Sequence, residues 1–174
     1  MKNKLTIIFI ILAFKTFAQT SANIAITVPS YALLDIAANN TAFNLNLIAP
    51  TDGGNSTTIN PTNSTKWINF TSAVAPGITR KITAQISGTV PAGLNLKLLI
   101  SPYTGAGGGT LGTSAGTLNL NGSAQIVVNN IGGAFTGDGI NNGYKLNYTL
   151  ELLDFSLLRS KTTTFSIIYT LADN

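Results

Sequence analysis

The chain of 174 residues has no histidine, no cysteine and only six carboxylate side chains. Most hydrolase mechanisms use imidazole or thiolate groups, and zinc and copper sites use the same two ligand types. A Ser–Lys dyad needs neither group, but no Ser-x-x-Lys spacing follows residue 18. We therefore expect a protein that is not an enzyme, with no catalytic residues, no metal site and no other cofactor.

Charge is also scarce, since Asp, Glu, Lys and Arg make up 9% of the chain, against about 25% in an ordinary globular domain. Asn, Thr, Ser and Gly must cover the surface instead. Such a surface suits a protein that packs against copies of itself or sits in a matrix. Without cysteine the chain has no disulfide, so packing alone must hold the fold, and we do not expect a lipid-anchored lipoprotein.

The basic excess is small once the first residues are set aside. Without Lys2, Lys4 and Lys15, seven basic residues stand against six acidic ones, a net charge of +1. The only adjacent basic pair, Arg80-Lys81, has no aromatic residues interleaved with it. Nucleic-acid binding depends on a concentrated basic face, so we expect no nucleic-acid partner.

The N-terminus has the pattern of an export signal. A basic start at Met1–Lys4 precedes the apolar run Leu5–Phe14, and small residues then allow cleavage before Gln19. This run is half of the roughly 20 residues that span a bilayer, and no later segment is apolar enough to span. We predict a signal peptide at 1–18 and a domain at 19–174, with no membrane span after cleavage. The expected location is extracellular or at the surface of a bacterial cell.

The rest of the chain alternates between apolar and polar residues. This period of two is typical of strands with one buried face, and a sustained helical period is missing. The short run Leu33–Ala37 suggests at most one helical turn. The regular alternations lie at 23–28, 43–47, 78–86, 94–100, 144–152 and 165–169, with less regular runs at 66–70 and 124–128.

Turn residues separate these runs. Pro91–Gly93 reads as a hairpin connection, and Asn141–Gly143 supplies residues that tolerate positive φ. Eight or nine short strands predict an all-β fold, a single antiparallel β-sandwich of immunoglobulin-like or jelly-roll-like form. Arg80 falls on the apolar side of its run. The predicted core comprises Ile82, Ile86, Leu96, Leu98, Leu146, Tyr148, Leu150 and Ile167.

Two motifs resemble binding loops. Gly107, Gly109 and Gly112 form a G-x-G-x-x-G pattern, but no helix follows to receive a pyrophosphate, so we predict a flexible loop between strands. The segment Asp138–Gly143 resembles part of a calcium loop. It supplies one carboxylate where calcium takes six to eight oxygens, so we predict a turn.

Two acids near a strand end could be read as a catalytic pair. Glu151 lies on the polar side of the run 144–152 and Asp154 just past its end, with Arg159 and Lys161 close in sequence. We interpret all four as surface charges at a strand exit.

Both ends of the predicted domain carry alternating strands, Asn23–Pro29 and Thr164–Leu171. In these ends and in its layout the chain resembles bacterial fimbrial-subunit and related secreted coat-type sandwich proteins. In those families a terminal strand pairs with a neighbouring subunit or with its own sheet. The resemblance therefore implies a role in assembly or adhesion.

Two functions follow as hypotheses. The first is a structural or adhesive cell-surface protein, a pilin-like subunit that associates with itself or with other surface proteins through an edge strand at 23–28. The alternative is a soluble extracellular module that binds carbohydrate or another small polar ligand. Such a module needs an aromatic platform, for which Trp67, Tyr31 and Tyr103 are the candidates. The sequence assigns no other ligand-binding residue.

Overall fold

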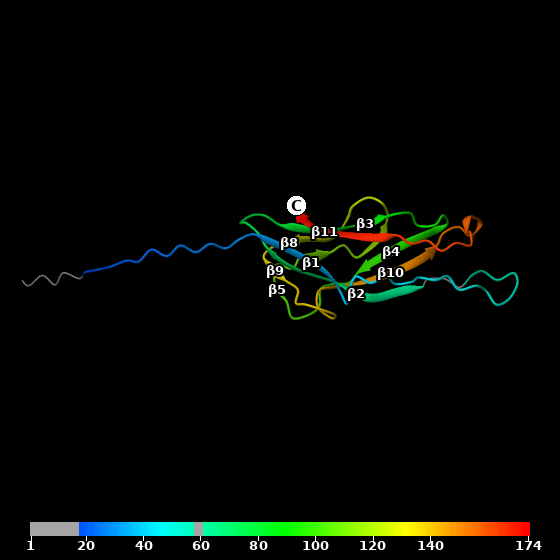
Figure 1. The fold of residues 1–174 in the computed structure, drawn as a ribbon, viewed down its shortest axis with the longest axis horizontal. Helices are drawn as coiled ribbons and strands as arrows, with labels where there is room; N and C mark the ends of the chain where they lie inside the picture. Colours follow the sequence, from blue (N-terminus) through cyan, green and yellow to red (C-terminus); the bar gives the residue numbers. More distant parts are fainter. Residues whose placement is uncertain (1–17, 58–60) are drawn as a thin grey trace, which may run out of the picture.

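The computed structural model describes residues 18–57 and 61–174, which form two antiparallel sheets packed as a β-sandwich (Figure 1). Eleven strands are assigned in these ranges, more than the eight or nine predicted, because three of them have only two residues. The described ranges contain one short 3-10 helix, Phe155–Leu157 (η1), and no helix with the length and apolarity needed to cross a membrane.

The larger sheet has seven strands in the order β5-β9-β2-β10-β4-β7, with β1 also paired to β2. The smaller sheet has four strands in the order β11-β3-β8-β6. The strands of the larger sheet are β1 (Tyr31–Ala37), β2 (Thr62–Ala73), β4 (Leu94–Ile100), β5 (Gly108–Gly109), β7 (Thr117–Leu120), β9 (Ala134–Phe135) and β10 (Tyr144–Leu152). Those of the smaller sheet are β3 (Arg80–Ser87), β6 (Thr113–Ser114), β8 (Gln125–Ile131) and β11 (Ser166–Asp173).

The core lies between the two sheets, as the alternation of apolar and polar residues predicted. Seven of the eight predicted core side chains are buried, because strands β3, β4 and β10 turn their apolar faces inward. The exception is Ile167, which is only half-buried. It lies on β11, an outermost strand of the smaller sheet, which has a neighbour on only one side within the described residues.

Leu33–Ala37, for which the sequence suggested at most one helical turn, belongs to strand β1. β1 runs antiparallel to β2, from Tyr31 opposite Ala73 to Ala37 opposite Trp67. Short apolar runs do not distinguish strand from helix, and here a long neighbouring strand supplies the hydrogen-bonding partner.

Two alternating runs are not strands in the structure. Residues 23–28 belong to an exposed, extended tail, and 43–47 form no assigned strand although Phe43, Leu45 and Leu47 are half-buried. The ring of Phe43 lies 4.8 Å from that of Tyr148. Alternation gives a segment the side-chain pattern of a strand, but a strand also needs a partner for its backbone groups.

Candidate functional site

The tail, which we define as residues 18–30, is the most exposed apolar segment of the described chain. Figure 1 shows it in blue, leaving the sandwich in an extended path. Ile24, Ile26 and Val28 are 83%, 83% and 77% exposed. They alternate with small or polar residues, and the tail carries no charged side chain. These features are those of a strand that lacks a sheet.

Strand β11 offers an open sheet edge. It pairs with β3 along its whole length, from Ser166 opposite Ser87 to Asp173 opposite Arg80. Its other edge has no strand partner in the described part of the chain. Natural sheets protect such edges with lysine, proline or bulges, but β11 has only a terminal Asp173. Its inward side chains Ile167, Tyr169 and Leu171 are only half-buried.

Strand β1 is the outermost strand beside β2 in the larger sheet, and it lies close to β11 across the side of the sandwich. Its outer edge is also unpaired within the described ranges, but Asp35 stands in its middle. A charge at the centre of an edge disfavours pairing with an apolar strand. Of the two edges, β11 is therefore the better acceptor for an added strand.

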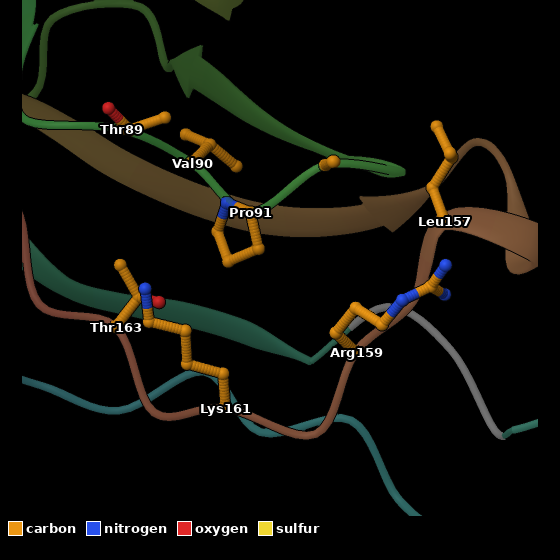
Figure 2. A pocket seen from close by; sticks show the side chains of 8 residues that line it. Thr89, Val90, Pro91, Leu157, Arg159, Lys161 and Thr163 are labelled. Carbon is orange, nitrogen blue, oxygen red and sulfur yellow. The ribbon is translucent and has the colours of Figure 1, made fainter.

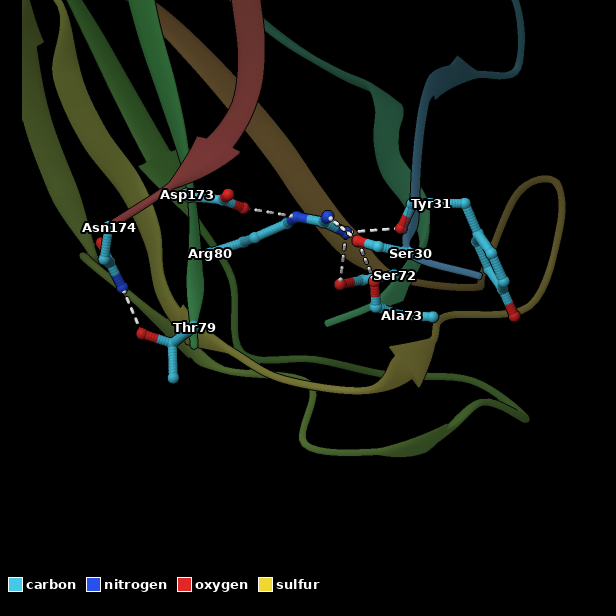
Figure 3. Close-up of polar contacts among 8 residues, drawn as sticks. All are labelled: Ser30, Tyr31, Ser72, Ala73, Thr79, Arg80, Asp173 and Asn174. Carbon is cyan, nitrogen blue, oxygen red and sulfur yellow. Dashed lines mark hydrogen bonds and ion pairs between the residues drawn. The ribbon is translucent and has the colours of Figure 1, made fainter. Parts of the chain in front are cut away.

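Arg80 joins these two edge strands at the root of the tail (Figure 3). Its side chain is on the inward face of β3, and the residue is 7% exposed. Nε donates to Asp173 Oδ1 of β11 at 2.8 Å, and Nη1 donates to the Tyr31 carbonyl of β1 and to Ser72 Oγ at 3.2 Å. Nη2 donates to Ser30 Oγ at 3.0 Å. The guanidinium thus holds β1, β2 and β11 together where the tail begins.

Two tyrosines connect the sheets behind β11. The hydroxyl groups of Tyr148 and Tyr169 lie 2.7 Å apart. Burial raises the pKa of Tyr148 to about 12 and also raises that of Tyr169 above its ordinary value. Both side chains are therefore neutral at physiological pH. Their hydrogen bond links β11 of the smaller sheet to β10 of the larger sheet.

The glycine-rich segment connects strands, as predicted, and its backbone packs closely against neighbouring residues. It runs from β5 in the larger sheet to β6 in the smaller sheet, and no helix follows it. A Cβ on Gly107 would lie 2.1 Å from the Phe135 carbonyl oxygen, and one on Gly109 2.1 Å from that of Gly133. The glycines thus allow close backbone contact, which explains the motif without a nucleotide.

Asp138–Gly143 forms a turn, as predicted. Asn69 of β2 crosses to it, donating through Nδ2 to the Asn142 carbonyl at 2.7 Å and accepting from the Gly139 amide at 2.9 Å. The described residues contain no group of three or more acidic, histidine or cysteine side chains that could hold a metal ion.

Glu151 and Asp154 have separate structural partners. Glu151 pairs with Lys97 at 2.7 Å, and this hydrogen bond lowers the pKa of its carboxyl. Asp154 caps η1 by accepting from the Ser156 hydroxyl and amide, which lowers its pKa as well. Each acid is committed to a surface contact, in line with the interpretation from sequence.

The three candidate platform aromatics do not come together. Tyr31 lies opposite Ala73, six residues along β2 from Trp67, which is about 20 Å at strand spacing. Lys145 Nζ lies 5.3 Å from the centre of the Trp67 ring. Tyr103 is used internally, since its hydroxyl donates to the Thr136 carbonyl at 3.2 Å and accepts from the Gly107 amide at 2.5 Å.

A shallow hollow of about 260 Å³ lies beside the loop 89–92 and the segment 157–163 (Figure 2). Arg159 and Lys161 line it, but Figure 2 shows their charged ends on opposite sides of the Pro91 ring. Arg159 Nη1 already donates to the carbonyls of Ser156 and Leu158. The two cations therefore do not converge on one ligand position.

A comparison with protein-family models gave no match, and comparisons with curated proteins and with solved structures gave none either. The tail and the open β11 edge therefore stand as the candidate site on their own geometry. Sequence reasoning identified the tail but missed the acceptor edge and the role of Arg80. The one available signal was an arginine on the apolar side of an alternating run.

Proposed function

We propose that this protein is a non-enzymatic structural or adhesive subunit of the cell surface, and that copies join by strand addition. Residues 23–28 of one copy pair with the free edge of β11 in another. The observation that carries the proposal is the exposed tail, in which three large apolar side chains face solvent at every second position.

The gain from such a contact is of the same order as its cost. Burying an aliphatic side chain gains about 1.5–3 kcal/mol, so Ile24, Ile26 and Val28 together contribute about 5–9 kcal/mol before costs. New ladder hydrogen bonds add to this gain, because the backbones of the tail and of the β11 edge then pair with each other. Association and ordering of the tail oppose it by about 4–15 kcal/mol. The added strand would also cover the half-buried Ile167, Tyr169 and Leu171, and this burial makes the free energy of association more favourable.

A peptide competition tests the proposal. The secreted chain from Gln19 should form multimers, and a synthetic peptide of residues 19–30 should shorten them by occupying β11. Ile26→Asp in the peptide should abolish this effect, because the charge falls on the face that enters the sandwich. Thr27→Asp is the matched control, since it places the same charge on the opposite face.

Light scattering across a peptide titration gives the readout. Equal competition by the Ile26→Asp and Thr27→Asp peptides would show that no face-specific strand is formed. A chain that remains monomeric at every concentration without peptide would also contradict the proposal.

A further inference from the structure

The junction between the tail and β1 determines which edge the tail can reach. β2 occupies one side of β1, so the free edge nearest to the tail in its own chain is the other side of β1. The shortest connection that pairs residues 23–28 with this edge is a hairpin with Pro29 and Ser30 as a two-residue loop. Such a hairpin would give the backbone groups of the tail hydrogen-bond partners within its own molecule.

Pro29 is incompatible with that loop. Two-residue hairpins use type I′ or II′ turns, and both require a positive φ at the first loop residue. The proline ring fixes φ near −65°. The tail therefore cannot close onto β1 through the shortest turn that the junction permits.

Arg80 opposes the same hairpin by a second route. The residues that flank a two-residue loop, here Val28 and Tyr31, must exchange both backbone hydrogen bonds. The Tyr31 carbonyl already accepts from Arg80, so a hairpin must share this acceptor with the guanidinium or displace it. Ser30 Oγ accepts from Arg80 and donates to the Ala73 carbonyl at 3.0 Å, so the loop position itself is tied to β2.

We infer that Pro29, supported by the contacts of Arg80 with Ser30 and Tyr31, prevents the tail from closing on its own β1 edge through a tight hairpin and leaves it for a second copy. This inference rests on the proposed function for its biological meaning, while the closure itself can be measured in a single molecule. Arg80 and Pro29 are then positioning residues that select pairing between molecules over pairing within one.

The test replaces the two junction residues by a sequence that favours a two-residue hairpin turn. Pro29→Asn together with Ser30→Gly creates Asn-Gly, the strongest short hairpin signal. In dilute monomer, amide hydrogen exchange at residues 24–28 should slow by at least about tenfold relative to wild type. Multimers should disappear at high concentration. Pro29→Ala, which removes the ring but supplies no positive φ, should exchange like wild type, as should Ser30→Ala.

Unchanged exchange in the Asn-Gly variant would overturn the inference, and so would equal slowing in Pro29→Ala. Tail amides already protected in the wild-type monomer would overturn it too. Slowed exchange in the Asn-Gly variant, with a wild-type chain that never assembles, would support the closure argument and contradict the proposed function. The inference about closure of the tail and the proposed function in assembly can therefore be contradicted independently of each other.

Discussion

Two neighbouring leucines on β4 test the assignment of faces in the sandwich. Leu98 is fully buried, whereas Leu99, the next residue, is 39% exposed. Leu98 lies between Tyr148 of β10 and Leu118 of β7 in the strand register. Replacing each leucine by alanine removes the same atoms from opposite faces of one strand, so the pair controls for composition and for local strand propensity.

The expected costs differ because only one change opens a cavity. Leu98→Ala should destabilise the fold by about 3 kcal/mol, within the 2–5 kcal/mol range of buried leucine truncations. Leu99→Ala should cost less than about 1 kcal/mol, since solvent already reaches its side chain. For a domain of this size, 3 kcal/mol corresponds to a fall in Tm of about 6–12 °C.

Urea unfolding followed by circular dichroism measures both free energies, and thermal melts give the two Tm values. Unchanged slopes with denaturant would show that the variants unfold from the same compact state. Equal losses at the two positions, or a larger loss for Leu99→Ala, would refute the face assignment for β4 and with it the packing of the larger sheet.

Two further predictions concern ionisation. Because burial raises the pKa of Tyr148 to about 12, the folded state holds this proton more tightly than the unfolded state does; the resulting stability is present below pH 10 and is lost progressively above it. Urea midpoints measured from pH 7 to 11 should be level to about pH 9 and then fall, and a midpoint that rises above pH 10 would contradict the burial of this phenol. Because the Lys97 hydrogen bond lowers the pKa of Glu151, an NMR titration of that carboxyl should move toward its ordinary value in Lys97→Met, and an unchanged midpoint would exclude the pairing.

The sequence predicted the sandwich well because most of its strands are buried on one face. The runs at 94–100 and 144–152 agree with β4 and β10, and both strands have partners on two sides. The alternation of side chains then determines which residues enter the core, and this information is local.

The errors occur where pairing depends on distant residues. β1 is a strand because β2 lies beside it, and 23–28 is not one because no strand of the described ranges pairs with it. The partners of Arg80 could not be predicted for the same reason, since Tyr31 and Asp173 come from strands far apart in the chain. The tail, which is half of the candidate site, could be predicted from the sequence. The acceptor edge could not, because identifying it requires the order of strands in the smaller sheet.

The central claim, that the tail of one copy pairs with an edge of another, is tested most directly by deleting Gln19–Val28 and measuring molar mass by light scattering. Because the tail lies outside both sheets, the truncated chain should keep the circular dichroism spectrum and Tm of the intact chain. It should be monomeric, and when mixed with intact chains it should shorten their multimers, since it accepts a tail but donates none. A truncated chain that associates as the intact chain does, or that leaves the length of intact multimers unchanged, would contradict the account.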